Sequence, residues 1–497
     1  MVTLGIICPS FPEATPLEAD FRESELQTAY SFTQGLLGDP IPPGLSLVQP
    51  DIVTRDLTLE LYSQWQFEAE TNDATGGEAF TLSRTYLIPR DTALNGRRDT
   101  TLAACLAGAE TLIPLRELSP PMIALRVDGL SAGDEGYPLI WETRARFPAD
   151  GEGQGSRDRK KEARAAALRI ELETLLRERT AAANPLLETR PRLFWLAAAG
   201  DLMLGRGAGD ILLREGPGGI FGETAGPLMT ADLSIVNLEG AVSSRGSRVE
   251  KTYNFRFPPL MAGALQQAGI DAVLLANNHI YDFGPDAFLD TLSHMEAAGI
   301  GILGAGRNLE AAASPFVFSR TDWDGVKLPP VHVFGIASYP REASGWDGLS
   351  IAAGENKPGI LHAGRGGTDK LKEGFSAEAL DMVFFHGGSE WTTAPDTRTR
   401  GIYTDLIKAG ADIIIGSHPH IVQGFEWIEG KPVFWSLGNF VFAGMENTGG
   451  GDEGLFLQLG FLEKRLVYIE PFPLTLSGPQ TKIAPMEELK TFYTRSR

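Results

Sequence analysis

The sequence predicts an α/β protein, and three observations support this prediction. From Leu193 onward, short apolar runs alternate with segments of helical periodicity, which is the pattern of βαβ units around a mainly parallel sheet. A second set of apolar runs follows towards the C-terminus, and two sheets packed face to face with helices outside would account for both sets. All seven histidines lie in this half of the chain. We therefore expect any metal or acid–base chemistry to be located there.

The composition is that of a globular protein with room for two or three domains. Of the 497 residues, 43% are hydrophobic and 22% are charged, and no run reaches the roughly 18 consecutive apolar residues that a membrane span requires. The formal net charge of −20 argues against nucleic-acid binding, because lysine and arginine must neutralise the phosphate backbone. Two cysteines are too few for a disulfide framework or a thiolate metal site.

The first residues allow two interpretations. Met1 to Cys8 is a short apolar run, which is typical of an N-terminal strand. The same run is also compatible with the remainder of a lipoprotein signal in which Cys8 is the acylated residue. Under that alternative we expect the protein in the cell envelope, extracytoplasmic or membrane-associated.

Residues 1–150 are expected to form an N-terminal domain. Strand-like runs such as Ala124 to Val127 occur beside helix-like segments from Phe21 to Leu37 and from Thr101 to Ala107, so we expect an α/β or α+β fold. The stretch from Pro114 to Phe147 resembles the closing segment of solute-binding domains of the phosphate-binding type. That likeness implies a degenerate solute-binding or docking domain.

A charged linker helix is expected at residues 151–190. From Gly151 to Thr180 a Gly-rich start is followed by a highly charged segment with Ala, Leu and Ile at helical spacing. Basic and acidic residues alternate along it, which favours a solvated linker over a basic binding patch. Residues 191–497 are then expected to form the second domain.

In the second domain, each strand is predicted from a short apolar run and each helix from a segment of helical periodicity. The expected strands are, in order, LFWLAAAG from Leu193, LSIVNLE from Leu233, DAVLLAN from Asp271, VHVFGIAS from Val331, DMVFFHG from Asp381 and ADIIIGS from Ala411. The expected helices run from Pro285 to Ala298 and from Arg398 to Ala409. Glu429-Gly430 predicts a hairpin turn, and two further strands are expected from Gly454 to Leu462 and from Arg465 to Ile469.

Most of these strands are followed by a side chain that is competent to bind a metal. The side chains concerned are Asp201, Glu239, Asn277, Asn278, His279, His386, Glu390, His418 and His420. Ligands of such sheets gather at the carboxyl ends of the strands, so these side chains are expected to lie together. Two divalent cations about 3.5–4 Å apart need a bridging carboxylate and further nitrogen and oxygen ligands from several loops. Carboxylate, amide and imidazole together predict manganese, iron or zinc rather than calcium.

The pair His418 and His420 sets a condition on the backbone. Alternate residues of an extended chain point in opposite directions, so both rings reach one site only if the chain turns after the strand. Pro419 between them is consistent with such a turn. Of the other histidines, His294 and His332 are expected to be structural, and His362 lies in a Gly-rich loop without an assigned role.

Six ordered motifs carry a family resemblance. GDLMLGR, NLEG, NNHIYDFG, HGGSEW, GSHPHIVQG and SLGNF resemble, in sequence and spacing, the CapA family of poly-γ-glutamate capsule biosynthesis proteins, which is similar to the calcineurin-like metallophosphoesterases. The resemblance covers about Leu193 to Leu474. It implies a four-layer α/β/β/α sandwich with a two-metal site.

The resemblance also implies a role for each site residue. The implied metal ligands are Asp201 and His420 on the first ion, Asn278, His386 and His418 on the second, and Glu239 bridging both. His279 would contact the scissile group or protonate its leaving group, and Asp282 would orient the His279 ring. The residues expected to bind substrate are Arg206, Lys251, Tyr253, Arg256, Glu390 and Asn439. Two positions depart from the expected motifs. Met203 stands where the superfamily has a histidine ligand, which implies a first metal that is weakly held or absent, and Gly387 stands where the family has tryptophan.

The expected function is that of a metal-dependent hydrolase with two divalent ions. It would cleave a phosphoester or a γ-glutamyl bond of an anionic polymer, alongside membrane polymer-synthesis proteins and without nucleic acid. The alternative is a non-catalytic binding or scaffold component of a polymer synthesis or export complex, which Met203 and the extra N-terminal domain favour. A nucleotidase-like phosphatase would share the same site, because pocket shape selects the organic part of a substrate.

Overall fold

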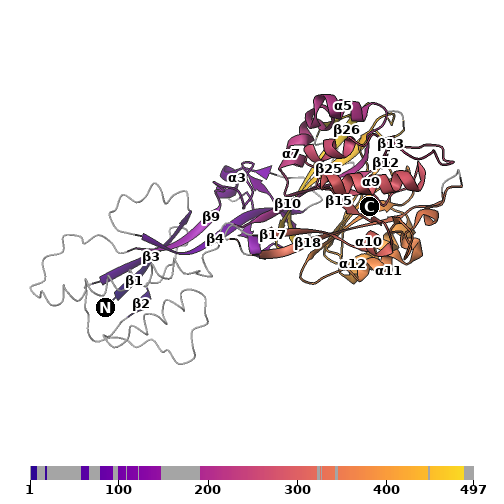
Figure 1. Ribbon diagram of the computed structural model, residues 1–497. Coiled ribbons are helices and arrows are strands. Elements are labelled where there is room, and N and C mark those ends of the chain that lie inside the picture. Colours follow the sequence, from indigo (N-terminus) through magenta and orange to yellow (C-terminus); the bar gives the residue numbers. More distant parts are fainter. Residues whose placement is uncertain are drawn as a thin grey trace, which may run out of the picture. The chain divides into compact units, whose positions relative to one another are not determined.

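The computed structural model describes residues 2–7, 17–19, 57–65, 79–92, 99–107, 109–120, 122–146, 191–321, 325, 327–341, 345–445 and 448–485. The chain divides into two compact units (Figure 1). The first unit comprises Met1–Arg90, Asp99–Leu118 and Leu125–Pro191, and the second comprises Asp91–Arg98, Ser119–Ala124 and Arg192–Arg497. Cys8, the segment from Phe21 to Leu37 and the expected linker helix lie outside the described residues.

The first unit contains a sheet with the strand order β2-β1-β3-β9-β4-β6. Its strands are β1 (Val2–Ile7), β2 (Leu17–Ala19), β3 (Leu57–Trp65), β4 (Ala79–Thr92), β6 (Leu112–Pro114) and β9 (Ile140–Arg146). Three short elements lie between the strands of this sheet in the sequence. They are β5 (Asp99–Thr100), β8 (Arg126–Val127) and the 3-10 helix η3 (Leu115–Glu117). The helix expected near Thr101 is α3 (Leu102–Leu106), because the Thr101 side chain accepts the Ala104 N–H and caps its first turn.

The second unit is built on two sheets. The first has the order β15-β14-β11-β10-β25-β26-β27 with β24 beside β10, and the second has the order β17-β18-β20-β21-β23-β22. The strands of the first sheet are β10 (Leu193–Met203), β11 (Leu233–Leu238), β14 (Ala272–Leu274), β15 (Gly301–Leu303), β24 (Asn439–Phe442), β25 (Glu453–Leu462), β26 (Arg465–Ser477) and β27 (Gln480–Ile483). Those of the second are β17 (Phe316–Thr321), β18 (Lys327–Ser338), β20 (Leu380–Gly387), β21 (Ile413–Ser417), β22 (Val422–Ile428) and β23 (Lys431–Leu437). Every strand expected from the sequence of this half is present.

The two sheets pack face to face, and the side chains of β20 show how. Met382 and Phe384 belong to the large apolar core shared with the first sheet. Val383 and Phe385 belong to a separate core that the second sheet shares with helices on its other side. Successive side chains of a strand point to opposite faces, so a continuous apolar run is what a strand buried on both faces requires.

Helices cover the outer face of each sheet, as Figure 1 shows. The first sheet is covered by α5 (Ala208–Glu215), α6 (Pro217–Phe221), α7 (Ala225–Thr230), α8 (Met261–Gln267) and α9 (Gly284–Ala298). The second is covered by α10 (Leu309–Ala313), α11 (Gly367–Lys372) and α12 (Thr397–Ala409). The remaining short elements are β7 (Met122–Ala124), β12 (Ala241–Val242), β13 (Arg256–Phe257), β16 (Ala305–Gly306), β19 (Gly359–Ile360), η4 (Gly222–Thr224), η5 (Gly348–Ile351) and η6 (Ala363–Arg365). The predicted four-layer α/β/β/α arrangement is confirmed.

One hairpin of the second unit follows from local chemistry. The hairpin predicted at Glu429-Gly430 joins β22 to β23, and φ angles of 49° and 75° at these residues are those of a two-residue type I′ turn.

Ile123 of β7 packs in the core of the second unit although it precedes the linker in sequence. Where the domain boundaries fall stays a prediction. Among the described residues, no helix is long and apolar enough to cross a membrane.

Gly200→Ala is expected to destabilise the second unit. A Cβ atom at Gly200 would overlap the carbonyl oxygen of Gly438, which accepts the Asp201 N–H at 3.0 Å. We expect a loss of about 1–3 kcal/mol in urea unfolding, as for other overpacked cores. The control is Gly226→Ala in α7, where the added methyl group meets nothing within 4 Å. Its stability should be unchanged or higher by up to about 1 kcal/mol, and an equal loss in both variants would contradict the overlap.

Candidate metal centre

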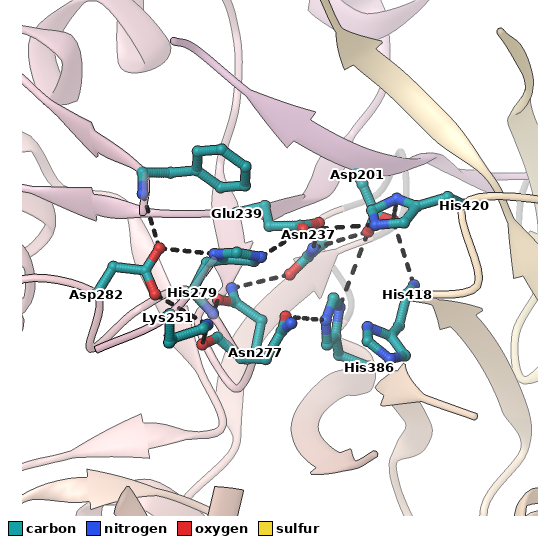
Figure 2. Close-up of polar contacts among 12 residues, drawn as sticks. Asp201, Asn237, Glu239, Lys251, Asn277, His279, Asp282, His386, His418 and His420 are labelled. Carbon is teal, nitrogen blue, oxygen red and sulfur yellow. Dashed lines mark hydrogen bonds and ion pairs between the residues drawn. The ribbon is translucent and has the colours of Figure 1, made fainter. Parts of the chain in front are cut away.

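Parallel strands of both sheets deliver the predicted side chains to one edge. In the first sheet β10, β11 and β14 run parallel, and in the second sheet β18, β20, β21 and β23 run parallel. Asp201 lies in β10, His386 lies in β20, and Glu239 follows directly after β11. Figure 2 shows these side chains converging from different elements.

Asp201, Glu239 and His386 form the middle of the cluster. Each offers one ligand atom within 4.8 Å of the other two, and all three side chains are buried. Asp201 Oδ1 lies 3.8 Å from His386 Nδ1. This spacing is too long for direct hydrogen bonds and leaves room for a cation between the ligand atoms.

His418 and His420 reach the same point because the chain turns after β21. Their φ angles are 100° and 57°, in the left-handed region that side chains other than glycine rarely adopt. The His418 N–H donates to Asp201 Oδ2 at 3.3 Å, and His420 Nδ1 lies 3.3 Å from the same oxygen. His420 Nε2 lies 3.9 Å from Glu239 Oε1. The turn predicted for this motif is therefore present, and strained backbone of this kind occurs mainly at functional sites.

Amide side chains hold the carboxylates in place. Asn237 Nδ2 donates to Asp201 Oδ1 at 2.8 Å and to Glu239 Oε2 at 3.3 Å. Asn277 Nδ2 in turn donates to Asn237 Oδ1 at 3.1 Å. Asn278 Oδ1 lies 3.1 Å from His386 Nε2, so the remaining expected ligand also joins the cluster. All six expected ligands thus lie in one buried network.

His279 and Asp282 form a hydrogen-bonded pair beside this network. Their Nδ1 and Oδ2 atoms are 2.6 Å apart, and His279 Nε2 lies 3.7 Å from Glu239 Oε1. Asp282 also accepts the Phe255 N–H at 2.7 Å and the Lys251 ammonium at 3.0 Å. A carboxylate held by three donors fixes the orientation of the imidazole, which presents its other nitrogen to the centre.

The residues expected to bind substrate divide into buried and exposed members. The Lys251 side chain is only 1% exposed. Its ammonium group contacts Asp282 and donates to the Asn278 carbonyl at 2.7 Å, which suits a role in positioning Asp282 better than direct contact with substrate. Asn439 Oδ1 lies 2.9 Å from His420 Nδ1. Arg206 is exposed, and its guanidinium group donates to the Ala443 carbonyl at 2.6 Å.

Three further members of that set are also exposed. Tyr253 is 61% exposed, and Arg256 donates to the Arg245 carbonyl at 2.9 Å. Glu390 is near enough to the centre for its charge to raise the pKa of Glu239. The part of each residue in substrate binding stays a prediction.

Burial and mutual charge set the protonation of the cluster. Burial first, and then Asp201, hold the pKa of Glu239 well above its ordinary value. Burial and the neighbouring imidazoles keep the pKa values of His386 and His418 well below theirs, so both rings are neutral, the form that binds metals. Burial opposes a charge on His420, yet Glu239 and Asp201 raise its pKa to about 10. The two carboxylates therefore attract a positive charge, which either a proton or a cation can supply.

Unsatisfied atoms show that these residues fit a cation. Among the described residues, neither Glu239 Oε1 nor His418 Nδ1 has a hydrogen-bond partner, although both atoms are buried. A buried carboxylate oxygen without a donor is costly, and a bound cation removes that cost. Met203 contributes nothing here, because it lies in the apolar core with its sulfur accepting the Gly205 N–H at 3.0 Å.

Met203→Leu is expected to leave metal binding unchanged. Leucine fills a similar volume, so the loss of stability should stay below about 1.5 kcal/mol. Metal content by elemental analysis and urea unfolding of the same preparation measure both effects. Loss of metal from a folded variant would show that Met203 takes part in the centre.

Sequence reasoning named Asn277 only among the side chains that follow a strand, and it missed Asn237 and the ring of Tyr339. Asn237 and Asn277 are buried polar residues within or next to apolar strands, and that contrast is the signal that points to them. The Tyr339 ring lies 5.6 Å from the ring of His418 and 5.7 Å from that of His362. Tyr339 and the loop histidine thus form a layer behind the His418 ring, which no sequence pattern indicated.

These contacts define a buried carboxylate, amide and imidazole centre of the kind that holds divalent cations. The sequence of this unit matches the model of the family described as bacterial capsule synthesis protein PGA_cap over residues 195–444. The chain belongs to this family.

The curated relatives carry capsule and polymer names. The chain is 27% identical to the PGA biosynthesis protein CapA of Bacillus subtilis, over 49% of this chain and 62% of that protein. It is 26% identical to the capsule biosynthesis protein CapA of Bacillus anthracis, over 53% and 64%, respectively. A probable polyglutamine synthesis accessory protein of Mycobacterium tuberculosis is 28% identical over 42% and 55%. The chain thus matches less than two thirds of the length of each of these relatives.

One solved structure is similar in outline. It is a phosphatase from Mycoplasma pneumoniae that is 14% identical and covers 58% of this chain and 96% of its own, with a TM-score of 0.36. A TM-score of this size is too low to transfer any property to this chain.

Proposed function

We propose that the protein is a metal-dependent hydrolase that cleaves a phosphoester or a γ-glutamyl bond during the synthesis of a poly-γ-glutamate capsule or another cell-envelope polymer. The observation that carries the proposal is the buried trio Asp201, Glu239 and His386, with an imidazole–carboxylate pair beside it. The names of the capsule and polyglutamine relatives support an anionic polymer as the substrate.

The six clustered side chains would hold two divalent ions of manganese, iron or zinc. They are Asp201, Glu239, Asn278, His386, His418 and His420. Such ions, when bound, polarise the scissile group and lower the pKa of a bound water molecule. The division of the six ligands between two ions follows the family resemblance.

His279 would act as the acid that protonates the leaving group. Its Nδ1 is held by Asp282 at 2.6 Å, so Nε2 is the atom that carries or releases a proton towards the centre. The Phe255 ring packs 4.3 Å from the imidazole, and Lys251 keeps the charge of Asp282 compensated in a buried place. These residues orient the acid and exclude water from one side of it.

We place this activity in the cell envelope, beside membrane proteins that synthesise the polymer. Anchoring through an acylated Cys8 would suit that location, and the acidic chain has no expected nucleic-acid partner. A globomycin-sensitive shift in the mass of the N-terminal peptide of the expressed protein would test the anchor.

A non-catalytic binding component of a polymer synthesis or export complex is the second candidate. It is favoured by the core position of Met203, which leaves the first ion of the expected pair one imidazole short. The described residues contain one group of three metal-competent acidic or histidine side chains, and not two.

Hydrolysis assays separate the two candidates. The purified protein, loaded with manganese and in parallel stripped with chelator, is incubated with poly-γ-glutamate, aryl phosphates and nucleotides. We expect metal-dependent release of product from at least one class, and the class identifies the bond. Polymer binding without turnover of any of the three would favour the scaffold and contradict the hydrolase.

A further inference from the structure

Solvent reaches the candidate metal centre mainly at two imidazole rings. His279 and His420 are the most exposed members of the cluster, at 7% and 5%. The other members are at most 3% exposed, namely Asp201, Glu239, Asn278, His386 and His418. A substrate therefore approaches the buried ligands past His279 and His420, and these two rings define the open side of the centre.

An exposed tryptophan lies at this open side. The ring centroid of Trp391 is 5.4 Å from that of His420, and Trp391 is 45% exposed. The other tryptophans whose side chains the structure describes are buried or half-buried, namely Trp195, Trp346, Trp427 and Trp435. A large aromatic surface that is left open beside a reactive centre suits contact with a ligand.

The backbone holds the Trp391 ring in this place. The Trp391 N–H donates to the carbonyl of Pro419 at 2.9 Å, and the buried Gln423 side chain donates to the carbonyls of Thr392 at 2.9 Å and Ala394 at 3.3 Å. The φ angle of Trp391 is 62°, which bulky residues rarely adopt. Such strain occurs mainly at functional sites, and a ring that is already fixed loses little conformational freedom when a ligand binds.

Arg206 borders the open side from the loop that follows β10. Its Cζ atom lies 5.7 Å from the ring centroid of Phe255 and 6.0 Å from that of Phe442. The Phe255 ring packs 4.3 Å from His279, and the Phe442 ring packs 5.1 Å from His420. The guanidinium group is thus one ring away from both histidines of the open side.

The two borders of the open side differ in charge. The loop that carries Trp391, residues 388–396, contains Glu390 and Asp396 and no lysine or arginine. It therefore repels anions and offers a flat uncharged surface, whereas Arg206 attracts an anion. A γ-linked glutamyl chain carries a free carboxylate in every repeat and would place one against this acidic loop. A phosphoester of an uncharged ring carries its charge on the phosphoryl group alone.

We propose that Trp391 is the surface on which the organic group of a phosphoester substrate stacks, and that this group is an uncharged aromatic ring. The inference rests on the proposed function and selects the phosphoester from its two candidate bonds. Aromatic rings stack on tryptophan in offset or tilted arrangements, and the bases of nucleotides do so irrespective of their identity. Trp391 would thus determine which esters the centre accepts.

The test measures binding of two phosphonates to the manganese-loaded full chain by isothermal titration calorimetry. Phenylphosphonate and methylphosphonate have the same anionic group and no ester to hydrolyse, so only the ring differs. Phenylphosphonate should bind more tightly, and Trp391→Ala should weaken its binding by about tenfold while leaving methylphosphonate unchanged. Trp391→Phe, which keeps a ring, should retain most of the difference. The matched control is Val317→Ala, an exposed apolar position on the edge strand β17, which should bind both ligands as the unmodified protein does.

A second pair of ligands identifies the source of the ring. Adenosine monophosphate and ribose phosphate differ only in the base. A higher kcat/KM for adenosine monophosphate that Trp391→Ala removes would identify a nucleotide base as the stacked group. Equal values for the two, together with the preference for phenylphosphonate, would assign the surface to smaller aryl groups.

The outcomes separate this inference from the proposed function. If the unmodified protein binds both phosphonates equally, or if Trp391→Ala weakens both equally, the stacking role is wrong, and the hydrolase still stands on its own assays. If Trp391→Ala weakens binding of a γ-glutamyl oligomer and spares phenylphosphonate, Trp391 contacts the polymer and the choice of a phosphoester is overturned. If the protein binds neither phosphonate and hydrolyses no candidate substrate, the inference and the proposed function both fail.

Discussion

Glu239→Gln is expected to weaken metal binding strongly and at the same time to stabilise the metal-free protein. Glu239 Oε1 has no hydrogen-bond donor among the described residues, whereas both oxygens of Asp201 accept N–H groups. A bound cation would therefore stabilise the Glu239 carboxylate more than the Asp201 carboxylate. The affinity for manganese should fall by more than the roughly 10–100-fold that follows loss of a supporting hydrogen bond, and by more than in Asp201→Asn.

The sign of the stability change follows from proton linkage. Burial raises the pKa of Glu239 above its ordinary value of 4.5, so the metal-free native state binds this proton more tightly than the unfolded state does. The contribution of this group to stability is then present at low pH and falls as the pH rises above about 4.5. Glutamine cannot ionise, so the variant avoids that loss.

Thermal unfolding in excess chelator between pH 5 and 9 checks this expectation. The melting temperature of Glu239→Gln should exceed that of the unmodified protein by a margin that grows with pH. Glu296→Gln, at an exposed position of α9, serves as the control and should show no such trend. Equal metal loss in Glu239→Gln and Asp201→Asn would contradict the bridging role of Glu239.

His279→Ala is expected to remove most of the catalysis and to leave the metal in place. His279 lies beside the cluster, 3.7 Å from Glu239, and its ring is oriented by Asp282. Loss of a positioned general acid should lower kcat by roughly 10²–10⁴-fold with little change in KM. Asp282→Asn should lower kcat less, because the imidazole remains present but is no longer held by a charged partner.

His294→Ala provides the matched control, since His294 lies in α9 and takes no part in the cluster. Its kcat and metal content should equal those of the unmodified protein. A His279→Ala variant with undiminished kcat would show that the leaving group is protonated by another group. Metal loss in the same variant would instead make His279 a ligand.

The strands and the site at their ends could be predicted because both depend on local sequence. In DMVFFHG, residues 382–385 are apolar at every position, which only a strand buried on both faces requires, and His386 follows them. The hairpin at Glu429-Gly430 was predictable because two residues with positive φ suit a type I′ turn.

Other features depend on contacts between distant segments and left no local pattern. Lys251 was expected to bind substrate, yet its ammonium group forms a buried ion pair with Asp282, 31 positions away in the sequence. The three residues of β7 are too few to show a period, and their place in the second unit is set by packing on β26. Met203 has the spacing of a ligand, and only its packing shows that it belongs to the core.

The most direct test of the metal centre is a count of the ions that the purified protein binds. The protein is stripped with chelator and titrated with manganese, and bound metal is measured by elemental analysis after removal of free ions. We predict stoichiometric binding, approaching two ions for each chain, with loss of at least one ion in His386→Ala because that ring lies within the central trio. A folded protein that binds no manganese, iron or zinc under these conditions would contradict the account.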